Sequence, residues 1–102
     1  MSNRDEFDRK LREVLGSTNT YFQPPESVKL KYPCFVYEFS RDNVRHADDK
    51  AYLTHTGYDV TVITKDPDIT YKDELKEAFT YCEWVRAFVS DNLNHNIYKI
   101  YF

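Results

Sequence analysis

The chain has 102 residues, a formal net charge of −3 and an aromatic content of 17%. This length predicts one domain, residues 1–102, with a core of its own, and nine tyrosines beside two glycines favour a β-rich globular fold over disorder. The mild charge, with both signs interspersed, disfavours a direct nucleic-acid binder, because such proteins need a basic surface.

The first predicted element is an amphipathic helix over residues 3–15. Asn3 is the expected cap, and the acidic side chains of Asp5 and Glu6 suit the first turn of a helix. Gly16 suits the position after its last turn. The apolar side chains recur at helical spacing, at Phe7, Leu11, Val14 and Leu15.

Two extended segments and two loops follow this helix. A short extended piece at Thr20–Gln23 meets two prolines, which open a polar loop as far as Lys31. The next predicted strand is Tyr32–Ser40, with apolar groups on both faces. After it come the mixed-charge residues of Arg41–Ala51, which are predicted to form a long, mobile and functional loop.

A central antiparallel strand is predicted within Tyr52–Asp68. Its β-branched and aromatic residues suit a pleated, half-buried surface. Asp66-Pro67-Asp68 ends the strand, since proline cannot donate to the ladder. One face of the strand consists of Tyr52, Thr54, Thr56, Tyr58, Val60 and Val62.

The last third of the chain predicts a second helix and two more strands. Thr70 can cap a short helix of about 10 residues, with an apolar stripe at Leu75, Ala78 and Phe79. Cys82–Ser90 is the third long strand, residues 91–95 form a turn, and Asn96–Phe102 is the closing strand. One face of the third strand carries Trp84, Arg86 and Phe88, and the other carries Val85, Ala87 and Val89.

These elements define an α+β fold in the order α-β-β-β-α-β-β. An antiparallel sheet of about four main strands is expected, with two helices packed on one face. Most strands carry apolar groups on both faces, so a partner surface is expected to cover the second face. Large aromatics dominate interface energetics, and the predicted subunit interface is Trp84, Arg86 and Phe88. The alternative is a face of scattered tyrosines that tolerates water.

No group of residues points to catalysis, and neither a cofactor nor a metal is expected. Cys34 and Cys82 lie inside separate apolar segments, which suits core residues and matches no metal-binding spacing. His46, His55 and His95 form no pair at helical spacing, and the two glycines form no phosphate-binding loop. The chain is therefore predicted not to be an enzyme.

One polar cluster has two interpretations. Asp91, Asn92, Asn94 and His95 combine a carboxylate, two amides and an imidazole. A tight turn needs the same residue types, because Asn and Asp tolerate left-handed backbone geometry. The segment is predicted to be a turn with a contact role. The alternative is a small ligand-binding or enzymatic α+β domain that uses Asp91, Asn94 and His95.

Four segments together resemble a known family. Behind an N-terminal amphipathic helix lie YFQPP at Tyr21–Pro25, YPCFVYE at Tyr32–Glu38, YDVTVITKDPD at Tyr58–Asp68 and DNLNH at Asp91–His95. In order and spacing they are similar to the small tail-terminator, or tail-completion, proteins of long-tailed bacteriophages. The resemblance spans almost the whole chain, and none of its motifs is catalytic.

The resemblance implies a structural virion protein of the tail or neck, assembled in the host cytoplasm. Family members form a hexameric ring that caps the finished tail tube and offers a joining surface to the head connector. The implied partners are other copies of the chain, the tail tube protein and the connector or stopper protein. No membrane partner is expected, since no apolar run approaches the roughly 20 residues of a membrane span. Another neck component, such as a head-completion or connector protein, is the alternative.

The resemblance also implies a role for the loop at Asn43–Ala51, which would project into the central channel or toward a neighbouring ring. Its candidate contact residues are Arg45, His46, Asp48, Asp49 and Lys50. In such a ring, the acidic residues of the loop offset its basic ones. DNA is therefore expected to pass through the lumen without specific binding.

Overall fold

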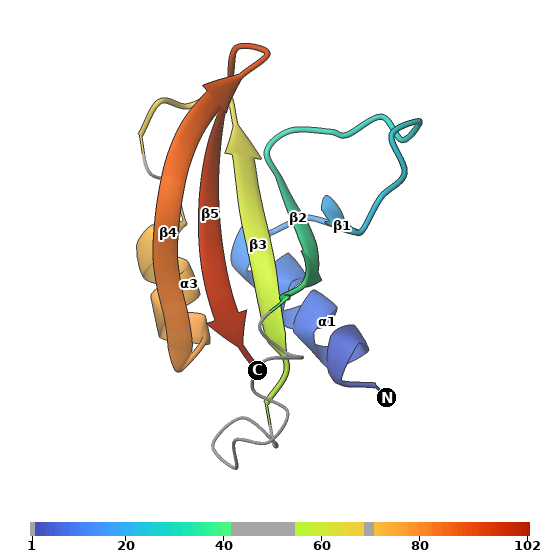
Figure 1. Ribbon diagram of the computed structural model, residues 1–102, viewed down its shortest axis with the longest axis vertical. Coiled ribbons are helices and arrows are strands. Elements are labelled where there is room, and N and C mark those ends of the chain that lie inside the picture. The colour runs from blue at the N-terminus through green and yellow to red at the C-terminus, as the bar shows by residue number, and fades with distance from the viewer. Residues whose placement is uncertain (1, 42–54, 69–70) are drawn as a thin grey trace.

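The computed structural model describes residues 2–41, 55–68 and 71–102 (Figure 1). Within these ranges the elements are α1 (Asn3–Leu15), β1 (Thr20–Phe22), β2 (Cys34–Phe39), β3 (Gly57–Thr64), α3 (Lys72–Ala78), β4 (Tyr81–Ser90) and β5 (Leu93–Tyr101). Several residues named above lie outside the described residues: Arg45, His46, Asp48, Asp49, Lys50, Tyr52, Thr54 and Thr70.

The strands form one sheet in the order β1-β2-β3-β5-β4. β1 pairs with β2 in parallel, and the other three pairings are antiparallel. Both helices pack on the same side of the sheet, behind it in the view of Figure 1. The α+β class is therefore confirmed, and the short strand β1 is a fifth member of the sheet beyond the main strands of the prediction.

The core lies between the two helices and alternate residues of β2, β3 and β5. Phe7 of α1 is fully buried and stacks on Tyr58 of β3, with ring centroids 4.0 Å apart. Cys34 is buried and Cys82 packs against the core, which fits their predicted role. The buried cluster consists of Phe7, Leu11, Leu15, Phe35, Tyr37, Tyr58, Val60, Val62, Leu75, Phe79, Tyr98 and Ile100.

Ser2, rather than Asn3, caps α1. The Ser2 hydroxyl accepts a hydrogen bond from the Asp5 backbone N–H at 3.1 Å, and the Asp5 carboxylate accepts one from the Ser2 N–H at 3.4 Å. Asn3 lies inside the helix, where its side-chain amide donates to the Phe102 carbonyl oxygen. Gly16 follows the last turn with φ 78, as predicted, because glycine adopts this left-handed conformation without strain.

A polar cluster around Asp8 fixes α1 to the sheet. The Tyr37 hydroxyl donates to Asp8 Oδ1 at 2.7 Å, and the Thr20 hydroxyl donates to the same oxygen at 2.9 Å. Arg12 Nε lies 2.9 Å from the other carboxylate oxygen, Asp8 Oδ2. One carboxylate thus joins α1 to both β1 and β2, and charge-assisted bonds of this kind are the stronger class.

α3 is shorter than the predicted helix. It spans seven residues, and its N-cap is Tyr71, which has φ 66 and makes no side-chain capping hydrogen bond. Leu75 is fully buried and Phe79 nearly so, which confirms these two members of the predicted apolar stripe. Packing of this stripe, rather than a capping side chain, therefore holds the short helix in place.

The hairpin between β4 and β5 turns in two residues. Asp91 and Asn92 have φ 53 and 62, and Ser90 pairs directly with Leu93. Two successive positive φ values are typical of a tight hairpin turn that needs no further residues. The prediction of a turn over residues 91–95 is therefore wrong in its extent, since β5 begins at Leu93 and includes Asn94 and His95.

Candidate interaction surface

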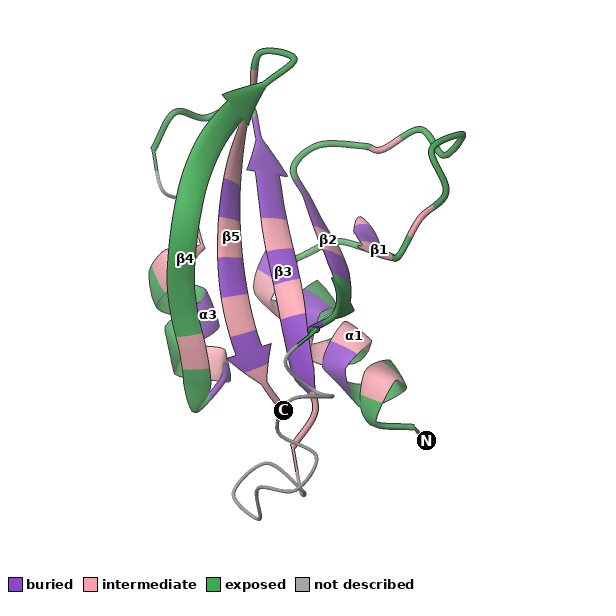
Figure 2. Ribbon diagram, viewed as in Figure 1, coloured by how far each residue is buried: buried purple, intermediate pink, exposed green. Residues whose placement is uncertain are grey.

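β4 is a long edge strand with an exposed surface. Among the described strands it pairs only with β5, and of its ten residues only Cys82 is partly covered (Figure 2). Its exposed large apolar side chains include Val89, which is 69% exposed, and Tyr81, which is 54% exposed. An edge strand of this kind offers its outer backbone N–H and C=O groups to a strand from another chain.

A β-bulge in β4 divides the residues predicted as the subunit interface. Trp84 pairs with Tyr98 and Arg86 pairs with Ile97, so Val85 is an extra residue between them. Because of this extra residue, Trp84 lies on the helix-covered face, whereas Arg86 lies on the opposite, open face. The prediction that Trp84, Arg86 and Phe88 share one face is therefore wrong.

The contacts of the three side chains match this division. Trp84 Nε1 donates to Asn96 Oδ1 at 3.2 Å, and Asn96 is buried. Phe88 stacks on His95 with ring centroids 4.6 Å apart, and the Arg86 guanidinium lies 5.4 Å from the Phe88 ring. Arg86 and Phe88 thus form one cluster on the open face, and Trp84 packs on the other side of the sheet.

The open face of the sheet carries charge as well as apolar groups. Glu38, Asp59, Lys99 and Glu83 are direct neighbours across β2, β3, β5 and β4. Partial burial raises the pKa of Asp59, and the adjacent Glu38 raises it further, while Arg41 opposes the shift. The expected second apolar face is therefore a mixed one, with a charged row beside Val36 and Ile97.

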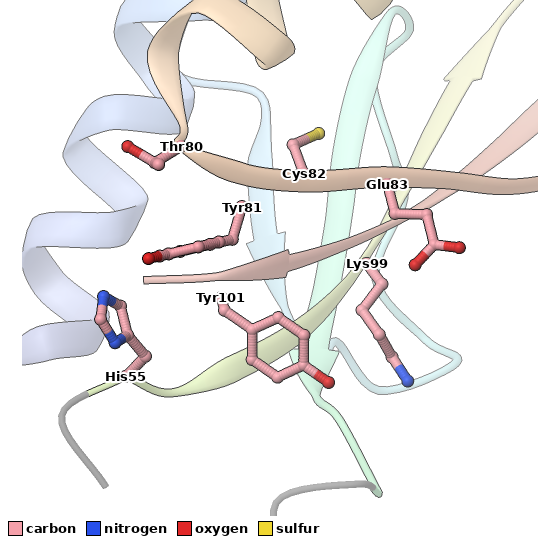
Figure 3. Close-up of a pocket in the computed structure, with 7 residues that line it drawn as sticks. All are labelled: His55, Thr80, Tyr81, Cys82, Glu83, Lys99 and Tyr101. Carbon is pink, nitrogen blue, oxygen red and sulfur yellow. The ribbon is translucent and has the colours of Figure 1, made fainter. Parts of the chain in front are cut away.

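A surface pocket of about 410 Å³ lies at one end of this face. Figure 3 shows the rings of His55, Tyr81 and Tyr101 at one side of it and the side chains of Glu83 and Lys99 at the other. The His55 ring meets the Tyr81 ring edge to face at 5.1 Å. This arrangement offers a small, mixed polar and aromatic concavity, and its lining residues are His55, Thr80, Tyr81, Cys82, Glu83, Lys99 and Tyr101.

Cys82 is the one thiol that borders the pocket. Its side chain points to the side of β4 away from Glu83 in Figure 3. Burial raises the pKa of the Cys82 thiol, although Lys76 opposes the shift. A raised pKa keeps the thiol protonated near neutral pH, and a protonated thiol is a poor nucleophile.

The residues of the predicted turn motif do not converge on one site. Asp91 and Asn92 lie exposed at the hairpin tip. Asn94 and His95 are successive residues of β5, so their side chains point to opposite faces of the sheet. His95 Nδ1 lies 3.1 Å from the Leu93 carbonyl oxygen, and its ring is covered by Phe88.

Sequence reasoning missed a second exposed region, the segment 23–33 between β1 and β2. We call this segment the arm; it loops out on the side of the sheet away from β4 (Figure 1). Val28 and Tyr32 are each 38% exposed. The signal was present, because apolar residues in a proline-bordered polar loop have no obvious place in the core.

The chain was compared with known proteins. No family model, curated protein or solved structure matches it. Among the described residues, no group of three or more His, Cys, Asp or Glu side chains could hold a metal ion. No described helix is long and apolar enough to cross a membrane.

Proposed function

We propose that the chain is a structural subunit of a bacteriophage tail, of the tail-terminator class. It assembles into a hexameric ring that caps the tail tube and offers the joining surface for the head connector. The observation that carries the proposal is β4, an edge strand of ten residues whose exposed apolar side chains require cover. The resemblance of four sequence segments to tail terminators supports the choice of this class.

The composition of the β4 edge favours association with another chain, because the strand has few of the features that prevent such pairing. Proteins that stay monomeric commonly guard an edge strand with charged side chains, above all lysine, with proline, with a bulge or with very short length. β4 is ten residues long and contains neither lysine nor proline, and its two charged residues, Glu83 and Arg86, are outnumbered by apolar ones. The bulge at Val85 interrupts the edge, but Arg86–Ser90 beyond it resume residue-by-residue pairing with β5. Half of the strand therefore stays regular and open to a neighbouring chain.

The proposed partners follow from a place at the end of the tail tube. They are other copies of the chain, the tail tube protein and the connector or stopper protein, in a virion neck assembled in the host cytoplasm. DNA would pass through the ring without specific binding. The residues proposed to face this lumen, Arg45, His46, Asp48, Asp49 and Lys50, carry two positive and two negative charges with the histidine neutral.

Size-exclusion chromatography with light scattering tests the proposal. A closed hexamer that binds tail tubes lacking their terminator, and then permits head attachment, is the expected result. A dodecamer that binds heads instead of tubes would favour the alternative neck component, a connector. A protein that binds neither tubes nor heads would contradict both assignments.

A further inference from the structure

The described residues expose eight large hydrophobic side chains, and seven of these fall into two groups at opposite edges of the sheet. The first group, the β4 patch, consists of Tyr81, Trp84, Val85, Phe88 and Val89, which flank this edge strand on both faces. The second group, the arm patch, consists of Val28 and Tyr32, and the eighth side chain, Phe39, lies at the end of β2 away from Tyr32. Figure 1 shows the arm and β4 on opposite sides of the sheet, separated by β2, β3 and β5.

We infer that the arm patch of one copy docks on the β4 patch of the next copy. This inference rests on the proposed assembly of identical subunits, and it names the two surfaces that meet. Contact between two different patches is heterologous, so an open chain of subunits always has one unused arm patch at one end and one unused β4 patch at the other. Such a contact forms a ring when the rotation between subunits closes.

Charge supports this pairing of surfaces. The arm carries Lys29 and Lys31 against a single acidic residue, Glu26. The opposite half of the domain, from α3 to the hairpin tip at Asp91, carries five acidic residues against three basic ones. β4 itself is neutral, with Glu83 and Arg86, so the acidic excess lies on α3 and at Asp91, which flank the strand. Complementary charge of this kind steers encounter and fixes the register of two surfaces.

The arm is held in shape before any contact. The Val28 backbone N–H donates to the Pro25 carbonyl oxygen at 3.1 Å, and the Lys31 N–H donates to the Tyr21 hydroxyl at 3.2 Å. Asn19 Nδ2 donates to the Pro33 carbonyl oxygen at 3.3 Å, close to the start of β2. A surface that is already ordered loses less conformational entropy on docking.

A mixing experiment separates this contact from other modes of association. The arm variant carries Val28→Asp with Tyr32→Asp, and the strand variant carries Val85→Asp with Val89→Asp. Each variant alone is expected to self-associate at least tenfold more weakly than the parent, since both sides of every contact are needed. A mixture is expected to form a one-to-one heterodimer and stop there, because only the arm of the strand variant and the β4 of the arm variant are intact.

Two other outcomes would overturn the inference. An arm variant that associates as well as the parent would show that β4 pairs with itself in a two-fold dimer, and a mixture that stays monomeric would show that the two patches do not meet. A parent that forms an open chain, or a ring of another size, with a normal mixing result would contradict the proposed hexameric terminator and leave the contact intact.

Two controls keep the test independent of folding. Ser17→Asp with Thr18→Asp places the same charges on an exposed turn outside both patches, and it should associate like the parent. Circular dichroism and thermal unfolding check every variant.

Lys29→Glu with Lys31→Glu changes only exposed arm side chains, and it should weaken association at low salt with a smaller effect at high salt. An equal effect at both salt concentrations, or no effect, would contradict the proposed attraction between the arm lysines and the acidic half of the domain.

Discussion

The two faces of the sheet differ in how their polar and apolar groups are partnered. On the helix-covered face, Asp8 receives hydrogen bonds from Tyr37 and Thr20 and pairs with Arg12, and Phe7 is fully buried among aromatic rings. On the open face, acidic Asp59 lies beside acidic Glu38. The first face holds the domain together, whereas no described helix covers the second.

The largest expected effect is on the helix-covered face. Phe7→Ala removes a ring that stacks on Tyr58 and contacts Tyr37 and Phe79, and it should lower the free energy of unfolding by about 3–5 kcal/mol. Urea denaturation of dilute protein measures this loss. Val89→Ala, at the most exposed position of β4, is the exposed-site control and should stay within about 0.5 kcal/mol of the parent. Equal losses would show that burial of the Phe7 ring does not set the cost of its removal.

The second prediction concerns the polar cluster of the helix-covered face. Asp8→Ala leaves the Tyr37 hydroxyl without its acceptor and Arg12 without its partner, and should cost about 1–3 kcal/mol. Glu13→Ala breaks an exposed pair with Arg9 and should cost at most about 0.5 kcal/mol. Thermal unfolding compares the two. A Glu13 variant as unstable as the Asp8 variant would show that Asp8 makes no special contribution.

The third prediction uses the bulge, which places two aromatic residues of β4 on different faces. Phe88→Ala should weaken association by on the order of 2 kcal/mol, or about thirtyfold, and leave the unfolding of dilute protein nearly unchanged. Trp84→Ala should also lower stability, because it removes the hydrogen bond to buried Asn96. Light scattering and urea denaturation give the two readouts. If the loss of association and the loss of stability stood in the same ratio for both variants, the bulge would not separate the roles of Trp84 and Phe88.

The sequence was informative about elements and faces, and less so about neighbours. Helical spacing located α1, and alternation assigned Tyr58, Val60 and Val62 to the buried face of β3. Alternation sets which face a residue occupies, but it does not set which strands are adjacent. β3 and β4 both carry apolar groups on two faces, yet only β3 lies between two other strands.

The candidate surface was harder to predict than the fold. The bulge at Val85 has no glycine or proline to signal it, so a regular strand was expected to align Trp84, Arg86 and Phe88. The extent of the hairpin turn was also missed, because Asn94 and His95 have the composition of a turn while they pair as strand residues. The channel loop residues lie outside the described residues, and their role stays a prediction.

The smallest expected effect concerns Asp59 on the open face. Its pKa is raised in the folded chain, first by partial burial and then by Glu38. A carboxyl group whose pKa is higher in the folded chain than in the unfolded chain favours folding while it is protonated. This contribution is complete below the unfolded pKa of about 3.9, and it is lost as the pH rises through the folded pKa. At neutral pH the charged Asp59 carboxylate therefore lowers the stability of the fold.

Asp59→Asn should remove this cost. Thermal unfolding of dilute protein should show a gain on the order of 0.5 kcal/mol at pH 7 and no gain below pH of about 3, where the parent carboxyl is already protonated. Asp68→Asn changes an exposed carboxylate beyond β3 and is the matched control, without such a pH-dependent gain. A loss of stability for Asp59→Asn at pH 7 would mean that its carboxylate is favourably paired within the chain. The open face would then resemble the helix-covered face in satisfying its own charges, and the contrast between them would rest on the β4 edge alone.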